Sequence, residues 1–154
     1  MSLEPIRKTL HVRCGVERAF ELFTQGMTTW WPFDTHSRHD EVDGATVERV
    51  EFPSEPGRPV LERLSSGHAL PWAELLVHEP PNRIVLAWKP NANPYPPTEV
   101  EVTFEPDGDG TRVALEHRAW ERLGDLAAEA HAGYDAGWDH VLGFYARAAD
   151  REGS

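Results

Sequence analysis

The sequence predicts one α+β domain in which a curved antiparallel sheet of about seven strands packs against a long C-terminal helix. Three observations support this fold class. Strand-like segments follow one another between residues 46 and 120, the connections between them are too short to hold helices, and residues 125–150 repeat apolar side chains at helical spacing. Neighbouring strands should therefore pair antiparallel as a meander, and not as parallel βαβ units.

One strand and two short helices are predicted to precede this meander. Residues 6–12 alternate in side-chain character, which predicts the first strand, and Gly15 ends it. Apolar side chains then recur three and four positions apart in residues 16–23, as in a short amphipathic helix. Residues 27–33 are too aromatic for a solvent loop and contain Pro32, so a second short helix or turn is expected to fold against the core.

Six further strands are predicted after the polar, turn-rich stretch 34–44, which is expected to be an exposed connection. Clusters of Pro, Gly and Asp separate the strand segments. The predicted strands are residues 46–52, 59–66, 72–79, 83–89, 98–105 and 111–120.

The C-terminal segment, residues 125–150, predicts a helix of about seven turns. Gly133 and Gly137 lie in the stripe expected to face the sheet, where small residues permit close backbone approach or leave room for a ligand. Because no repeat or interdomain linker interrupts this order, residues 1–154 are interpreted as a single domain with a core of about residues 6–149.

Composition excludes several classes of partner. A net charge of -11 and a pI near 5.1 disfavour nucleic acid and anionic membrane surfaces, since both attract Lys and Arg. Cys14 is the only cysteine, which favours a reducing compartment. The N-terminus lacks the apolar stretch of a signal peptide, and no segment is long and apolar enough to span a bilayer, so a cytoplasmic protein is expected.

Three stretches carry a resemblance to a known family. They are AELLVHEPPNRIVLAW, VEVTFEPDGDGTRVALEHRAW and GWDHVLGFYARAA. Together with the order of the elements, they resemble the START-like helix-grip (SRPBCC) superfamily, and within it the activator of Hsp-90 ATPase homologue-like (AHSA-type) family. The resemblance spans residues 6–149. It implies a helix-grip fold and a ligand-holding role, in a superfamily that includes lipid and hormone carriers, polyketide cyclases and co-chaperones.

Aromatic side chains are the candidate wall of a ligand pocket, because a sheet curved around a helix leaves room at one end. Trp88 and Tyr95 flank the Pro-rich loop and are the expected rim. The candidate ligand-binding residues are Trp30, Trp31, Phe33, Trp72, Trp88, Tyr95, His117, Tyr134 and Trp138.

His117 is the candidate for chemistry. Strict alternation with Val113 and Leu115 places it on the inward face of its strand. An inward imidazole can hydrogen-bond a ligand or donate a proton in a cyclase- or hydrolase-type site, together with a Tyr or Glu. It can equally be a core histidine satisfied by a backbone carbonyl or a Tyr hydroxyl. No catalytic residue is assigned on this basis.

Other polar clusters are interpreted as surface. His36, His39 and Asp40 form a weak metal-binding pattern, and a solvated loop without a metal is expected there. On the final helix His131, Asp135 and Asp139 are spaced four apart, as is ordinary on a solvated face.

Two further residues are expected to be structural. Glu74 should point to water, because Ala73, Leu75 and Val77 form the buried face of its strand. Cys14 is expected to be a small buried filler, since no base or oxyanion site accompanies it.

The sequence therefore predicts non-catalytic binding of a small, largely apolar ligand, without a cofactor, in a cavity of about 300–1,000 Å³ between the sheet and the C-terminal helix. Two alternatives remain open. One is a protein-interaction module whose partner is a chaperone or another protein, and the other is a cyclase- or hydrolase-type enzyme that uses His117.

Overall fold

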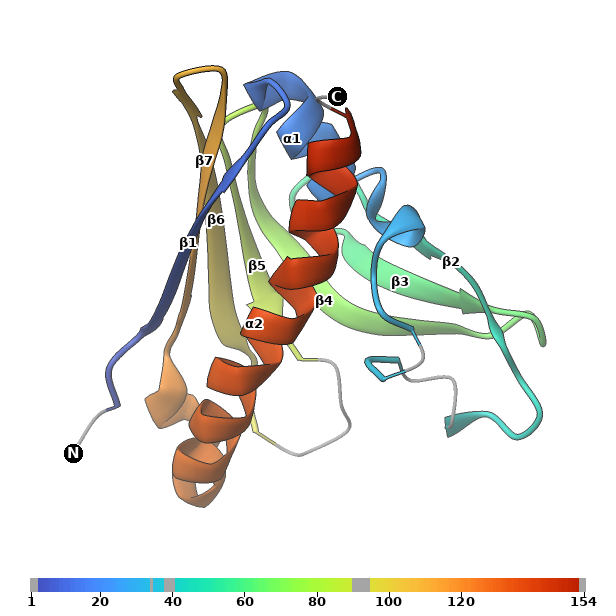
Figure 1. Ribbon diagram of the computed structural model, residues 1–154. Helices are drawn as coiled ribbons and strands as arrows, with labels where there is room; N and C mark the ends of the chain where they lie inside the picture. Colours follow the sequence, from blue (N-terminus) through green and yellow to red (C-terminus); the bar gives the residue numbers. More distant parts are fainter. Residues whose placement is uncertain (1–2, 34, 38–40, 90–94, 153–154) are drawn as a thin grey trace.

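The computed structural model describes residues 3–33, 35–37, 41–89 and 95–152. The strands are β1 (Ile6–Val12), β2 (Val47–Glu51), β3 (Pro59–Leu64), β4 (Ala69–Glu79), β5 (Arg83–Trp88), β6 (Thr98–Asp107) and β7 (Gly110–Arg118). The helices are α1 (Val16–Phe23), the 3₁₀ helices η1 (Met27–Thr29) and η3 (Trp120–Leu126), and α2 (Ala127–Glu152). The two short helices predicted before the meander are α1 and η1. The predicted long helix is α2 (Figure 1).

The seven strands form one antiparallel sheet in the order β1-β7-β6-β5-β4-β3-β2. The predicted meander from β2 to β7 is confirmed, and β1 joins it by pairing with β7, with Ile6 opposite His117 and Val12 opposite Thr111. In β6 the buried Val100, Val102 and Phe104 alternate with residues that are not buried. This period of two gives the sheet a concave, core-lining face and a convex face exposed to water.

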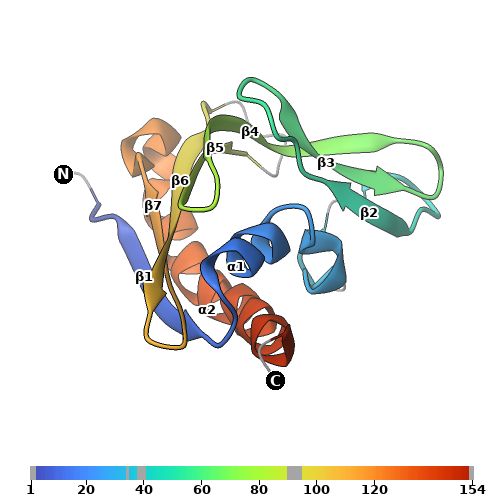
Figure 2. The same ribbon diagram turned by 90° about the horizontal axis from the view of Figure 1, so that it is seen from above.

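Register shifts bend the sheet. They occur between β2 and β3, between β3 and β4, and between β4 and β5. Each one inserts extra residues into one strand and increases its local twist. Seen from above, β2 and β3 project beyond α2 as a wing, while β5, β6, β7 and β1 stand beside the helix (Figure 2). The sheet is therefore curved, as predicted.

The face of α2 that packs against the sheet differs from the predicted one. Trp138, Val141, Leu142 and Tyr145 are buried, whereas Gly133 is exposed and a Cβ added to it would meet nothing within 4 Å. Adjacent stripes of a helix fit the same 3.6-residue period, and the stripe with the larger apolar side chains buries more area. The expectation that Gly133 faces the sheet is therefore wrong.

Aromatic side chains fill the space between α1, α2 and β6. Phe23 makes edge contacts with Phe104 and Tyr145, whose ring centroids lie 5.8 and 5.0 Å away. The Tyr145 hydroxyl donates to the carbonyl of Ala19 over 2.8 Å, so its polar end is satisfied inside the core. In the described residues, no helix has the length and apolar character needed to cross a membrane.

Candidate functional site

Eight of the nine candidate ligand-binding residues form a continuous series of ring contacts on the concave side of the sheet. Ring centroids lie 4.7 Å apart between Trp31 and Trp72, 6.3 Å between Trp31 and Trp88, and 5.4 Å between Trp88 and Trp138. We call this set the aromatic cluster. It consists of Trp30, Trp31, Phe33, Trp72, Trp88, His117, Tyr134 and Trp138.

His117 is fully buried and both of its ring nitrogens have partners. Trp138 Nε1 donates to His117 Nδ1 over 3.0 Å, and His117 Nε2 lies 2.7 Å from Thr98 Oγ1. An indole nitrogen can only donate, so Nδ1 accepts and the neutral ring carries its proton on Nε2. The Thr98 hydroxyl in turn donates a hydrogen bond to the carbonyl of Trp88 over 3.3 Å.

Burial keeps this imidazole neutral. It lowers the pKa of His117 from 6.5 to about 3, because a charged ring would lose its hydration, and the charge of His131 lowers it further. The inward orientation predicted for His117 is confirmed. Its partners are a Trp and a Thr, where a backbone carbonyl or a Tyr was expected. With both nitrogens engaged, the ring offers no free atom to a substrate.

Trp120 belongs to this environment although the sequence analysis did not select it. Its ring centroid lies 4.2 Å from that of His117, and its Nε1 donates to the carbonyl of His117 over 2.9 Å. Ala119, just before it, has a φ of 72°, a left-handed conformation that is uncommon for residues other than Gly. This sharp turn at the end of β7 directs Trp120 into the core.

A small hollow, which we call the mouth, opens between the sheet and the start of α2. It measures about 50 Å³, and Trp88, Tyr134, Leu123 and Leu126 are among its lining residues. This is well below the volume predicted for a ligand cavity. The aromatic cluster and its neighbours occupy the space that the sequence analysis left for a ligand.

The mouth contains an unsatisfied donor. Trp88 is only 6% exposed, and in the described part of the chain its Nε1 has no hydrogen-bond partner of acceptable geometry. Burial raises the pKa of Tyr134, and the nearby Trp88 indole partly opposes that shift. The Tyr134 hydroxyl therefore lies near this nitrogen, as a poorly aligned partner at most. A buried donor left unpaired costs about 1–3 kcal/mol, which an acceptor atom on a ligand would recover.

Tyr95, the ninth candidate, packs against η3. A Cβ built on Gly124 would be 3.1 Å from Tyr95 Cε1. Gly124 also has a φ of 52°, a conformation that favours glycine. The absence of a side chain at Gly124 thus lets the Tyr95 ring pack closely against η3.

Glu62 is a buried carboxylate that the sequence analysis missed. It is 0% exposed, its Oε1 accepts from Trp72 Nε1 over 2.9 Å, and its Oε2 accepts from Ser37 Oγ over 2.7 Å. Its neighbours at alternate positions, Val60 and Leu64, are also buried. That alternation was the available signal, since it places Glu62 on the inward face of β3.

The loop after η1 contacts α2 through His36. Its imidazole stacks on that of His140 with centroids 5.4 Å apart, and Thr35 Oγ1 lies 2.8 Å from His36 Nδ1. His39 and Asp40, the other members of the weak metal pattern, lie outside the described residues. Among the residues that are described, no group of three or more His, Cys, Asp or Glu side chains is arranged to hold a metal ion.

The remaining polar candidates lie at the surface or are structural. Asp135 and Asp139 form ion pairs with Lys8 of β1 at 2.9 and 3.1 Å, and His131 Nε2 contacts the carbonyl of Glu4. Cys14 is buried.

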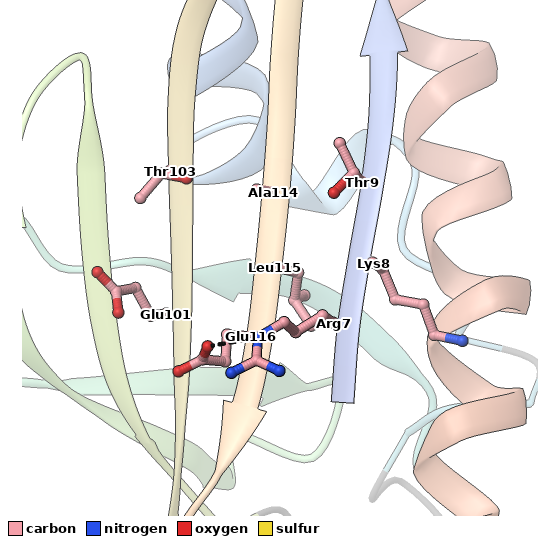
Figure 3. A pocket seen from close by; sticks show the side chains of 8 residues that line it. All are labelled: Arg7, Lys8, Thr9, Glu101, Thr103, Ala114, Leu115 and Glu116. Carbon is pink, nitrogen blue, oxygen red and sulfur yellow. Dashed lines mark hydrogen bonds and ion pairs between the residues drawn. The ribbon is translucent and has the colours of Figure 1, made fainter. Parts of the chain in front are cut away.

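A second hollow, of about 230 Å³, lies on the convex face (Figure 3). The small side chains of Thr9, Ala114 and Thr103 lie across its floor, and the Arg7–Glu116 ion pair borders it. It is separated from the aromatic cluster by the sheet, so the two cannot share one ligand.

Comparisons with known proteins place this geometry in context. The family model described as "Activator of Hsp90 ATPase homolog 1-like protein" matches residues 13–144. No curated protein matches the chain.

The solved structures that are similar to it include the following three. Protein MLL2253 from Mesorhizobium loti is 17% identical with a TM-score of 0.69, over 96% of this chain and 98% of that chain. The self-sacrificing resistance protein CalC from Micromonospora echinospora is 23% identical with a TM-score of 0.67, over 97% and 96%. An anthrahydroquino-gama-pyrone synthase, Txn09, is 29% identical with a TM-score of 0.57, over 87% and 88%. The first two likenesses show a shared fold.

Proposed function

The chain belongs to the family of activator of Hsp90 ATPase homolog 1-like proteins, and from that premise we propose that it binds a flat, largely apolar molecule at the mouth without transforming it. The observation that carries this proposal is the buried Nε1 of Trp88, which makes no well-formed hydrogen bond to any residue that the structure describes. It calls for a ligand that presents a hydrogen-bond acceptor to this nitrogen and stacks its apolar face on the neighbouring rings.

Fused aromatic ketones meet this requirement. Their rings are planar and apolar, and their carbonyl oxygens accept hydrogen bonds. Txn09, which is similar to this chain, is a synthase of an anthrahydroquino-pyrone and supports the same class. Because the mouth measures about 50 Å³, a fused-ring ligand must displace side chains there, and Leu123 and Leu126 are among those that line it.

Binding is tested with a hydroxyanthraquinone as the probe. We expect quenching of Trp fluorescence that saturates at one probe per chain, and a rise in Tm because the probe binds only the folded state. Trp88→Phe keeps an aromatic ring and removes the donor, so it should weaken binding about 3- to 10-fold, the value of one neutral hydrogen bond.

Anthracene, which has the rings without the acceptors, is the matched control. It should bind the wild type and Trp88→Phe equally. The proposal is wrong if the hydroxyanthraquinone neither quenches fluorescence nor raises Tm, and the role of Trp88 is wrong if both ligands respond alike to the substitution.

A ring-closing enzyme is the second candidate, favoured by the 29% identity to a pyrone synthase. Such an activity would act through Tyr134 at the mouth, since both nitrogens of His117 are engaged. It predicts that Tyr134→Phe abolishes product formation while leaving hydroxyanthraquinone affinity nearly unchanged. A chaperone or another protein as partner stays a prediction from the family alone.

A further inference from the structure

A β-bulge hollows the convex face where β3, β4 and β5 meet. Val60 pairs with Ala73 and the next residue, Leu61, pairs with Pro71, so Trp72 is the extra residue on β4. Trp72 and Ala73 both belong to the buried core. Because two successive side chains point inward, the convex face lacks one side chain at this position.

The resulting hollow measures about 280 Å³ and is mostly apolar. Pro59, Pro71 and Pro97 line it together with the small side chain of Ala87. Proline rings are rigid and have no donor to offer, so these walls suit an apolar contact. Leu76, the extra residue of the next bulge on β4, is 38% exposed and lies farther along the same strand.

Two opposite charges border this hollow, and neither has an ion-pair partner in the described part of the chain. They are Glu74 and Lys89. Glu74 pairs with Ala87 across the strands, and Lys89 follows Ala87 by two positions, so both side chains lie on the convex face as diagonal neighbours about 7–8 Å apart.

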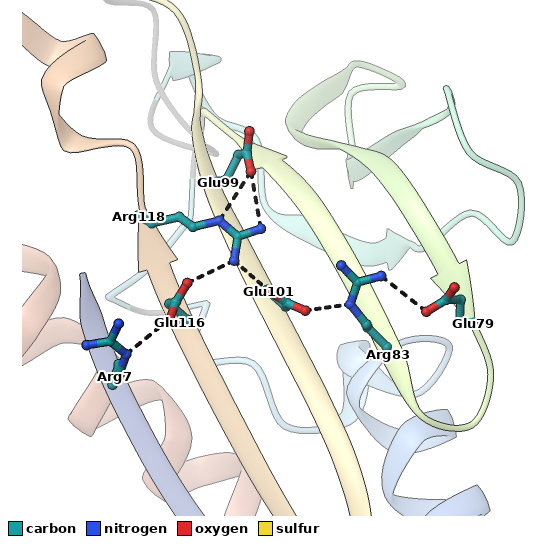
Figure 4. A network of polar contacts seen from close by, with 7 residues as sticks. All are labelled: Arg7, Glu79, Arg83, Glu99, Glu101, Glu116 and Arg118. Carbon is teal, nitrogen blue, oxygen red and sulfur yellow. Dashed lines mark hydrogen bonds and ion pairs between the residues drawn. The ribbon is translucent and has the colours of Figure 1, made fainter.

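Their isolation contrasts with the rest of this face. A continuous network of ion pairs joins the adjacent strands, in which Arg118 contacts Glu99, Glu101 and Glu116, and Arg83 contacts Glu79 and Glu101 (Figure 4). Charges on these strands are thus generally paired within the chain. Glu74 and Lys89 carry opposite charges, and within the described residues neither of them forms an ion pair.

We propose that this surface, formed by the hollow with Glu74 and Lys89, is where two copies of the chain associate. A two-fold axis lying in the plane of contact, between these residues, sets Glu74 of each copy against Lys89 of the other and so forms the same ion pair twice. The axis also brings the apolar walls of the two hollows together. A second copy is the partner that matches both charges at once, because the couple is its own complement.

Sedimentation of the full chain over a wide concentration range tests this, at about 0.15 M salt, where the repulsion between two chains of net charge -11 is screened within about 8 Å. We expect a monomer–dimer equilibrium. Glu74→Lys and Lys89→Glu should each weaken association at least tenfold, because each places like charges together twice. The double variant Glu74→Lys/Lys89→Glu should restore it to within about threefold of the wild type.

Leu3→Lys is the control, since Leu3 is also exposed, at 36%, and precedes β1, an edge strand that β7 and β6 separate from β5. It should leave association unchanged. All four variants alter surface residues, and an unchanged circular dichroism spectrum checks that they fold. A chain that stays monomeric at every concentration overturns the proposal. It is also overturned if neither single variant weakens association, or if the double variant does not restore it.

Discussion

At the scale of single residues, the most consequential feature is a histidine that cannot titrate in the ordinary range. His117 accepts from Trp138, contacts Thr98 and has no exposed surface. This ring connects β6, β7 and α2, because its two nitrogens form hydrogen bonds with Thr98 and Trp138. Only one arrangement of the three side chains satisfies both hydrogen bonds. Its contacts are therefore those of a structural group, which is one of the two interpretations that its position in the sequence left open.

This environment predicts how stability depends on pH. The unfolded chain protonates His117 near 6.5 and the folded chain near 3, so the unfolded state binds more protons between these values. The stability contributed by the neutral ring is present above pH 6.5 and is lost as the pH falls toward 3, at about 1.4 kcal/mol per pH unit. His117→Gln, which keeps a donor and an acceptor, should remove this dependence.

Urea unfolding of the wild type and His117→Gln at pH 7, 6, 5 and 4 measures the difference between the two slopes. His68→Gln is the matched substitution at the surface, because His68 is exposed. Parallel pH profiles for the wild type and His117→Gln would contradict the assigned neutral state.

At the scale of elements, the ion-pair network joins five strands, β1, β7, β6, β5 and β4, on the convex face. Glu101 is its centre, with a side chain 22% exposed between Arg83 and Arg118. Burial alone would raise the pKa of Glu101, but hydrogen bonds from the two guanidinium groups outweigh it and lower that pKa. The stability it contributes is present above the ordinary value of 4.5 and is lost as the pH falls below it.

Removing this central charge should be costly. Glu101→Gln leaves two guanidinium groups without their shared partner and should lower the free energy of unfolding at pH 7 by about 1–2 kcal/mol. Glu105→Gln is the matched control. Glu105 also pairs with an Arg, but its side chain is 56% exposed, so the change should stay within about 0.5 kcal/mol. Equal losses in the two variants would mean that burial in the network adds nothing.

Two glycines in different elements should respond in opposite ways to a methyl group. Gly133 lies within α2 with open space around it, so Gly133→Ala should stabilise the protein by about 0.5–1 kcal/mol. At Gly110, the first residue of β7, an added Cβ would be 2.0 Å from the carbonyl oxygen of Val12. Gly110→Ala should therefore separate β1 from β7 and lower Tm, and thermal unfolding measures both changes. A Tm that falls in both variants would contradict the exposed position of Gly133.

At the scale of the whole molecule, the wing should be the least stable part of the sheet. α2 packs mainly on β1, η3 and α1, whereas β2 relies on β3 and η1. We expect backbone amides of β2 to exchange hydrogen through local opening, and those of β6 and β7 only through global unfolding. Native-state hydrogen exchange measures this difference, and equal protection of β2 and β7 would show that the wing is not a separate unit.

The outline of this molecule was predictable from the sequence because alternation and helical periodicity are local signals. The inward position of His117 followed from Val113 and Leu115 alone. Details decided by competition between distant groups were not predictable. The sequence offers two adjacent stripes on α2, and only the packed sheet selects the one with Trp138 over the one with Gly133.

The polar contacts of the interior show the same limit. Alternation with Val60 and Leu64 could have placed Glu62 on the inward face, but its hydrogen bonds with Trp72 and Ser37 depend on packing that the sequence does not report. The volume of the mouth depends on how the indole rings pack, and the spacing of residues in the sequence does not predict that packing.

The pairing of β1 with β7 has a consequence for how the chain is made. Arg7 and its partner Glu116 are 109 residues apart in the sequence. During synthesis the first strand leaves the ribosome long before its hydrogen-bonding neighbour exists, and such distant pairings slow folding because a large loop must close first. The N-terminal strand should accordingly be among the last segments to become ordered, and until then the edge of β7 is open to other nascent chains.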